Sequence, residues 1–223
     1  PSPPHPQFRP ELNALPPKET TVPKLYDCDI SGSCYKIRLF LNILGVAYDA
    51  VPVDFVNKEH KTASYLALNP FGEIPIFEDG ELRLRDAQAI LVYVAGKYDK
   101  TRQWFPEDAT SQGKIAQWLS TGGGEVMNAA AARLVKVLSY PLDLEKLHAG
   151  ANRVFKIMDD HLTHRQFLEL DRPTIADIAC FPYTALAGEG GIDLSPYKNV
   201  LAWIERIKRL PGFIPMPGIP AAA

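Results

Sequence analysis

Two short segments in the first half of the chain carry residues whose types and spacing suit a binding site. The first is the turn at residues 29–34, with the sequence DISGSC, which places small hydroxyl and thiol side chains directly before an amphipathic segment. Unpaired N–H groups at a helix N-terminus stabilise an anion and lower the pKa of a thiol brought near them. The turn therefore indicates a site for a thiolate or another anion, although helix capping by Ser31 or Ser33 explains the same residues.

The second segment is Ile74-Pro75, where a proline stands at the start of an apolar strand. Proline lacks an N–H group and is tolerated in a strand only at the edge or the beginning. If the Ile74–Pro75 peptide bond is cis, it turns the backbone N–H and C=O of Ile74 outward, where an extended ligand can pair with them. The alternative is that Pro75 only fixes a turn.

The apolar periodicity predicts the elements that position these segments. Asp79-Gly80 between two apolar runs is a hairpin signal, and Asp86 is placed to cap a helix. The predicted strands are 24–28, 48–53, 74–77 and 81–84, and the predicted helices are 35–44, 57–68 with weak spacing, and 87–98. The resulting order, β-α-β-α-β-β-α, is the thioredoxin-like arrangement.

Every element predicted beyond this point is helical, so the chain divides into an α/β part and an all-α part. The predicted helices are 111–120, 124–138, 142–162, 175–186 and 199–210. The expected organisation is a leader at 1–23, a thioredoxin-like domain at 24–100, a linker at 101–110, an all-helical domain at 111–217 and a tail at 218–223.

The leader contains eight of the chain's 20 prolines. Bonds to proline favour extended backbone, so a helix or a central strand is not expected there. Two interpretations stay open: a disordered leader, or an ordered arm anchored by Phe8, Leu12 and Leu15.

Composition narrows the class of protein. The chain has 223 residues, 46% of them hydrophobic and 22% charged, which is typical of a soluble globular protein. A net charge of −2 lacks the basic footprint of a nucleic-acid binder. No apolar run approaches the roughly 20 residues of a membrane span. Three cysteines without a C-x-x-C motif argue against a disulfide framework and a structural zinc site. We therefore expect a reduced, cytoplasmic protein with no metal, no nucleic-acid partner and no membrane partner.

Four stretches, taken in order, carry a family resemblance. They are LYDCDISGSCYKIRLFLNILG at 25–45, NKEHKTASYLALNPFGEIPIFEDG at 57–80, LRDAQAILVYVAGKY at 84–98 and RPTIADIA at 172–179, the last with Thr174 and Asp177 at capping-box spacing. Together they resemble the cytosolic glutathione S-transferase family, in its bacterial, phi/theta-like serine type. The resemblance spans about Lys24 to Pro217 and implies a thioredoxin-like α/β domain followed by an all-α helical bundle.

The resemblance implies that Ser31 is the catalytic hydroxyl. In serine-type relatives this hydroxyl lies just before the first helix, four residues ahead of its first turn, and donates a hydrogen bond to the glutathione sulfur. Lowering a thiol pKa by about two units requires about 2.7 kcal/mol of preferential thiolate stabilisation. A charge-assisted hydrogen bond of about 1.5–3 kcal/mol, together with the helix N-terminus, supplies that amount. Ser33 and Cys34 remain alternatives to Ser31.

The same resemblance implies contacts along the tripeptide. His60 and Lys61 would hold the glycyl carboxylate by charge pairing, although this pair alone also fits solvated surface. Ile74, presented by Pro75, would pair its backbone with the cysteinyl unit, and Asp86 would meet the γ-glutamyl group.

Ala87 departs from the family pattern, in which a serine usually follows the acidic residue. The backbone N–H and the helix dipole remain, but one hydrogen bond worth about 1–3 kcal/mol is lost. Glutathione affinity is then reduced ten- to a hundredfold, or the chain has left the usual role.

The resemblance implies a glutathione transferase that stabilises the glutathione thiolate for attack on an electrophilic small molecule. Glutathione is the co-substrate, the second partner is a hydrophobic electrophile, and a homodimer is expected, with Phe71 near the interface. Two alternatives stay open: a glutathione-dependent disulfide or peroxide reductase, and a non-catalytic glutathione-transferase-like binding protein. Residues that fit either the electrophile pocket or the core are Trp118, Met127, Arg133, Tyr183, Phe213 and Met216.

Overall fold

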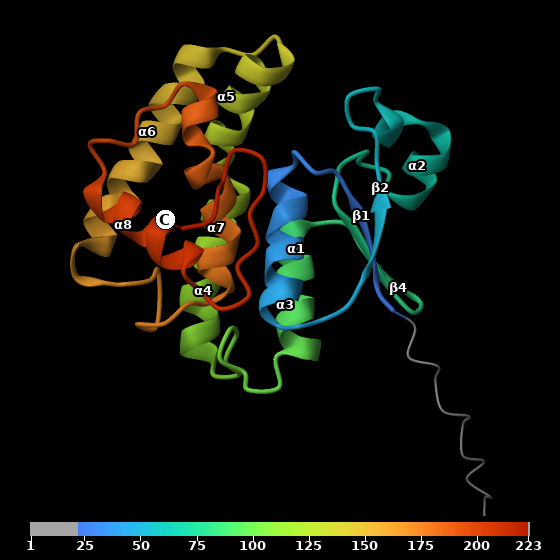
Figure 1. Cartoon of the computed structure of the whole chain (residues 1–223), viewed down its shortest axis with the longest axis horizontal. Helices are drawn as coiled ribbons and strands as arrows, with labels where there is room; N and C mark the ends of the chain where they lie inside the picture. The colour runs from blue at the N-terminus through green and yellow to red at the C-terminus, as the bar shows by residue number, and fades with distance from the viewer. Residues whose placement is uncertain (1–21, 223) are drawn as a thin grey trace, which may run out of the picture.

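The computed structural model describes residues 22–222, so the expectation for the proline-rich leader lies outside the described residues, apart from Val22 and Pro23. Figure 1 shows an α/β half on one side and a helical half on the other. Helices α1 and α3 lie between the sheet and the helical half, and α2 lies on the other side of the sheet. The predicted fold class is confirmed.

The α/β half has the predicted element order. It comprises β1 (Lys24–Asp27), α1 (Gly32–Ile43), β2 (Asp49–Pro52), the 3-10 helix η1 (Glu59–Lys61), α2 (Ala63–Leu68), β3 (Ile76–Asp79), β4 (Leu82–Leu84) and α3 (Ala87–Tyr98). The strand order is β2-β1-β3-β4, with β1 parallel to β2 and antiparallel to β3. This order places the turns that precede α1 and β3 at the same end of the sheet, next to the start of α3.

Several boundaries differ from the sequence prediction. The predicted helix 57–68 is replaced by η1 and the shorter α2, and two other differences lie next to the segments singled out above. Helix α1 begins at Gly32 rather than Tyr35, because the Ser31 side chain caps it by accepting a hydrogen bond from the Cys34 N–H at 3.2 Å. The first turn is small and polar, so the apolar spacing did not reveal it. Strand β3 begins at Ile76 rather than Ile74, since Pro75 has no N–H to give to the ladder. The Ile74-Pro75 peptide bond is cis.

The helical half is built around one buried helix, α7. Its elements are α4 (Ala109–Gly123), α5 (Met127–Leu138), α6 (Leu144–His161), η2 (Leu162–His164), α7 (Ile175–Ala185), η3 (Ala187–Gly190) and α8 (Lys198–Lys208). The predicted helices are confirmed, whereas the two 3-10 turns were not predicted. Helix α7 packs against α4 and α8 of its own half and against α1 and α3 of the α/β half, so one continuous core joins both halves. Along residues 22–222, no helix combines the length and apolar character needed to cross a membrane.

The predicted capping box fixes the start of α7. The fully buried Asp177 carboxylate accepts hydrogen bonds from the Thr174 N–H at 2.8 Å, the Leu168 N–H at 2.9 Å and the Trp203 Nε1–H at 2.9 Å. Burial raises the pKa of Asp177 to about 6 despite these donors. The carboxylate therefore ties α7 to α8 and to the loop before it.

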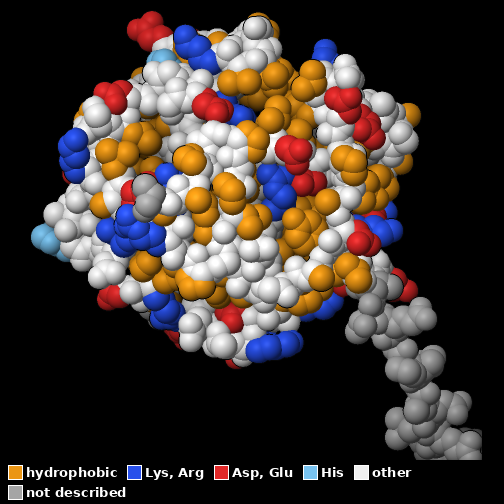
Figure 2. Space-filling view, viewed as in Figure 1, with side chains coloured by type: hydrophobic (Ala, Val, Ile, Leu, Met, Phe, Trp, Pro, Cys, Tyr) orange, Lys and Arg blue, Asp and Glu red, His pale blue; other side chains and the backbone are white. Residues whose placement is uncertain are grey.

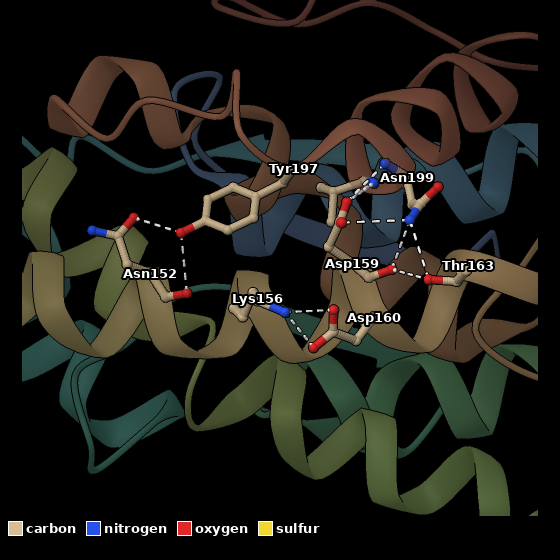
Figure 3. A network of polar contacts seen from close by, with 8 residues as sticks. Asn152, Lys156, Asp159, Asp160, Thr163, Tyr197 and Asn199 are labelled. Carbon is tan, nitrogen blue, oxygen red and sulfur yellow. Dashed lines mark hydrogen bonds and ion pairs between the residues drawn. The ribbon is translucent and has the colours of Figure 1, made fainter.

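A second polar network joins α6 to α8 (Figure 3). Helix α8 has no capping side chain of its own, and its N–H groups at Asn199 and Val200 donate instead to the Asp159 carboxylate of α6, at 2.7 and 3.1 Å. The Tyr197 hydroxyl donates to the Asn152 carbonyl of α6 at 3.2 Å. These contacts hold the outer helices and do not line the cavity described next.

Candidate functional site

A cavity of about 530 Å³ lies between the two halves. Its walls come from the turn before α1, η1, the segment before β3, the start of α3, and helices α5 and α7. In Figure 2 apolar side chains gather at the upper edge of the molecule, where α5 leans toward the α/β half in Figure 1. Six of the seven predicted site residues line the cavity, and Pro75 is buried behind them. The six are Ser31, His60, Lys61, Ile74, Asp86 and Ala87.

Ser31 is both a helix cap and a cavity residue, so the two interpretations of this turn are compatible. Because α1 begins at Gly32, Ser31 is the N-cap itself. It lies directly before the helix, as predicted, but not four residues ahead of the first turn. Its Oγ accepts from the Cys34 N–H. A hydroxyl that accepts one hydrogen bond keeps its own proton for donation. Ser31 can therefore donate into the cavity.

The structure argues against Cys34 as the alternative to Ser31 for the catalytic role. Cys34 is fully buried, its thiol faces the Tyr26 carbonyl at 3.9 Å, and it does not line the cavity. Burial raises the pKa of Cys34 above its usual range. Cys28 does line the cavity, but burial raises its pKa as well. Neither thiol is a ready thiolate at neutral pH, whereas Ser33 lines the cavity and stays an alternative hydroxyl.

His60 and Lys61 form one corner of the cavity with different electrostatic roles. The buried His60 ring stacks on Phe55 at a centroid distance of 4.2 Å. Burial, with Lys61 and Lys58 nearby, lowers the pKa of His60, so this ring offers a hydrogen bond rather than a charge at neutral pH. Its Nδ1 has no hydrogen-bond partner among the described residues. The positive charge of this corner comes from Lys61, whose Nζ donates to the Gly72 carbonyl at 2.6 Å.

The start of α3 forms the opposite corner. The Asp86 carboxylate caps α3 through Oδ1, which accepts from the Ala89 N–H at 2.8 Å. Ala87 is the first residue of the helix, is only 6% exposed and lines the cavity without a side-chain hydroxyl. Gln88 also lines the cavity, and its buried Oε1 has no partner among residues 22–222. Sequence reasoning missed Gln88, since a single polar residue near a helix start gives no distinguishing signal.

The helical half supplies an apolar wall and one cation. Helix α5 contributes Met127, Ala130, Ala131, Leu134 and Leu138 to the lining. Arg133 reaches across to the turn before α1, where Nη1 donates to the Ile30 carbonyl at 2.8 Å, and it pairs with Glu189. This side of the cavity suits an apolar molecule next to Ser31.

The electrophile-side candidates divide evenly. Met127, Arg133 and Tyr183 line the cavity. The other three do not line it: Trp118 and Met216 belong to the core and Phe213 packs against it, which is the alternative that the sequence had left open for them. Trp118, for example, donates its indole N–H to Glu169 at 3.2 Å.

Comparisons with known proteins agree with this architecture. The family model described as the glutathione S-transferase N-terminal domain matches residues 21–96, and that of the C-terminal domain matches residues 140–211. The chain is 30% identical over 219 residues to Glutathione S-transferase 3 of Zea mays, covering 90% of this chain and 98% of that protein. Among solved structures it resembles a glutathione S-transferase of Pseudomonas fluorescens Pf-5, with a TM-score of 0.82, 32% identity, and coverage of 88% and 99% of the two chains.

A second solved structure is a glutathione transferase homologue of Drosophila mojavensis with bound glutathione. The match has a TM-score of 0.77 and 25% identity, and covers 85% of this chain and 89% of that one. The fold places the chain among two-domain proteins in which a thioredoxin-like α/β half is followed by a helical half, with a cavity between the halves. Within that class, the chain belongs to the glutathione S-transferase family, as its sequence motifs predicted.

Proposed function

We propose that this glutathione S-transferase binds glutathione in the cavity between its halves and that Ser31 stabilises the glutathione thiolate there. Family membership supports glutathione conjugation as the general activity. The observation that carries the assignment to Ser31 is its hydroxyl, which lines the cavity and accepts from the α1 N-terminus, leaving its proton to donate. A hydroxyl polarised in this way is suited to an anionic sulfur.

The charges around the cavity match the two ends of the tripeptide. Glutathione carries a carboxylate at its glycyl end and both a carboxylate and an ammonium at its γ-glutamyl end. In our proposal Lys61 and His60 receive the glycyl carboxylate. The backbone of Ile74 pairs with the cysteinyl unit. The Asp86 carboxylate receives the ammonium, while the α3 N-terminus at Ala87 receives the second carboxylate. The Drosophila mojavensis homologue with bound glutathione supports this ligand for the fold.

The proposed reaction uses the sulfur lone pair. The thiol proton leaves to solvent, and the hydrogen bond from Ser31 holds the thiolate. The sulfur then forms a bond to the electrophilic atom of a substrate lying against the apolar wall of α5, while the electron pair of the broken bond leaves with the leaving group. The chain contributes orientation and thiolate stabilisation, and about 2.7 kcal/mol of the latter lowers the thiol pKa by about two units.

The test is a conjugation assay with a generic aromatic halide. Ser31→Ala is expected to lose about 10- to 100-fold in kcat/KM at neutral pH, which corresponds to one charge-assisted hydrogen bond. Glutathione binding measured by calorimetry is expected to persist. Ser195→Ala is the matched control, because that hydroxyl bonds only to Asp193, at 2.7 Å, and lies outside the cavity. A Ser31→Ala protein that melts normally and keeps the full rate would refute the assignment.

We also infer a homodimer, on the basis of one exposed aromatic side chain. Phe71 is 58% exposed, and the Arg85 guanidinium lies over its ring at 3.6 Å from the centroid. A large apolar ring held in one orientation at the surface is suited to insert into a partner. Sizing in solution is expected to show a dimer for the wild type and a shift toward monomer for Phe71→Ala. A monomeric wild type would refute the inference.

A further inference from the structure

Tyr183 reaches the proposed thiol site from the helical half. It belongs to α7, is buried, and lines the cavity. Its hydroxyl oxygen accepts from the Ser33 N–H at 3.2 Å and lies 3.3 Å from the Ser33 Oγ. The ring packs on Gly32 so closely that a Cβ there would lie 2.7 Å from the Tyr183 Cε1 atom. The phenol is therefore fixed against the first turn of α1.

This contact changes how the N-terminus of α1 meets the cavity. The sequence suggested a field of unpaired N–H groups, but two of these groups are already taken. The Ser33 N–H donates to Tyr183 and the Cys34 N–H donates to Ser31. Each hydroxyl accepts from the helix, and an accepted hydrogen bond strengthens the donation that a hydroxyl makes in turn. Two polarised hydroxyls thus stand between the helix end and the cavity.

We propose that Tyr183 is a second catalytic hydroxyl, which donates a hydrogen bond to the glutathione sulfur beside Ser31. The proposal rests on the proposed function, because it places the sulfur at the N-terminus of α1. A phenol is a stronger hydrogen-bond donor than an aliphatic alcohol, since it is the more acidic of the two. Removing this donor therefore reduces thiolate stabilisation even when Ser31 is intact.

The surroundings keep the phenol in its donor form. Burial raises the pKa of Tyr183, while its hydrogen bonds with Ser33 lower it, and the net direction is upward. The hydroxyl stays protonated at neutral pH. The Nζ of the buried Lys36, which like Gly32 belongs to α1, lies 5.4 Å from the ring centroid, so two positions of α1 contact the ring.

The experiment compares two buried tyrosines at the junction of the halves. Tyr183→Phe keeps the ring packing and removes only the hydroxyl. Tyr35→Phe is the matched control, because its hydroxyl donates to the Ile214 carbonyl at 2.6 Å and does not line the cavity. The pKa of the bound glutathione thiol is followed by the ultraviolet absorbance of the thiolate against pH. Calorimetry with S-methylglutathione, which has no thiol, reports binding alone.

The expected result is a rise of about one to two units in the bound thiol pKa for Tyr183→Phe, the equivalent of one charge-assisted hydrogen bond. The kcat/KM value falls about tenfold or more below the new pKa and recovers above it, whereas S-methylglutathione affinity is unchanged. Tyr35→Phe leaves the thiol pKa at its wild-type value. Gly32→Ala is a second route to the same result, because its Cβ displaces the ring.

Several outcomes would overturn the inference. An unchanged thiol pKa in a folded Tyr183→Phe protein means that the phenol only caps α1. A raised pKa in Ser33→Ala, with none in Tyr183→Phe, assigns the second donor to Ser33. A wild type that binds S-methylglutathione but shows an unperturbed thiol pKa also overturns the inference, while glutathione binding stands. A wild type that binds neither ligand refutes the proposed function and this inference with it.

Discussion

A buried lysine at the junction of the two halves gives a quantitative prediction: Lys36→Met stabilises the protein at neutral pH. Lys36 is only 1% exposed, and no carboxylate pairs with its ammonium among the described residues. Its one hydrogen bond goes to the Gly122 carbonyl at a long 3.4 Å, and the Tyr183 ring lies 5.4 Å away. Methionine is also long, unbranched and flexible, so it fills the same space without the charge.

The structure sets the size of the effect. Burial lowers the pKa of Lys36 from about 10.5 to about 8, a change that corresponds to about 3 kcal/mol. The substitution also removes a weak hydrogen bond and a cation–π contact, each worth about 1 kcal/mol. The net gain expected for Lys36→Met at pH 7 is therefore about 1–2 kcal/mol in the free energy of unfolding.

The sign of the pH dependence follows from proton binding. Below pH 8 both the folded and the unfolded wild type carry the Lys36 proton, and the folded protein bears the full cost of the buried charge. Between pH 8 and about 10.4 the unfolded chain still holds that proton while the folded protein has released it. More protons in the unfolded state mean that stability rises with pH. Across this interval the free energy of unfolding of the wild type therefore rises relative to that of Lys36→Met.

The assay is urea unfolding of both proteins at several pH values from about 7 to 10. Lys114→Met, at an exposed lysine of α4, is the matched control. At each pH the free energy of unfolding of the wild type is subtracted from that of the variant. The contributions of the other titrating groups cancel in this difference, so only the Lys36 contribution changes with pH. The reasoning is wrong if Lys36→Met is less stable than the wild type at pH 7, or if its advantage is the same at pH 7 and pH 10.

Two further predictions concern α3 and α7. Ala87→Ser is expected to tighten glutathione binding about tenfold in calorimetry, because it adds a hydroxyl at a lining position that has none. Unchanged affinity would mean that the ligand does not reach this corner. Asp177→Ala is expected to lower the free energy of unfolding by about 3–5 kcal/mol, since it leaves the Trp203 indole and buried backbone donors unpaired. The exposed cap Asp143→Ala should cost only about 1 kcal/mol, and equal losses would contradict the account.

Features of the fold that depend only on residues close in the chain, such as helix caps, were the ones best predicted from the sequence. Asp86 caps α3, and the Thr174–Asp177 capping box starts α7, because both motifs need only the following turn. Six of the seven predicted binding residues meet at one cavity, since the strand order brings three separate turns to one end of the sheet. The roles assigned to those residues stay predictions until ligand binding is measured.

Features that depend on the second half of the chain were harder to predict. Spacing marks Trp118 and Tyr183 equally as apolar helix positions, yet only Tyr183 turns toward the cavity. The difference lies in which helix packs on α1, and a helical period does not encode that. The sequence also could not show the charge state of His60, for which charge pairing was predicted. The burial of this ring lowers its pKa, and neither the burial nor the stacking on Phe55 can be read from residue spacing.

The contact between Gly32 and Tyr183 links domain packing to chemistry. A side chain at residue 32 would displace the phenol, so the missing Cβ is what allows α7 to approach the first turn of α1. The position of α7 in turn depends on the buried Asp177 network at its start. Loss of that network is expected to shift the helix that carries Tyr183, while Ser31 belongs to the start of α1. Variants of the α7 cap are therefore expected to raise the bound thiol pKa as well as to destabilise the fold, which a purely structural role for Tyr183 would not produce.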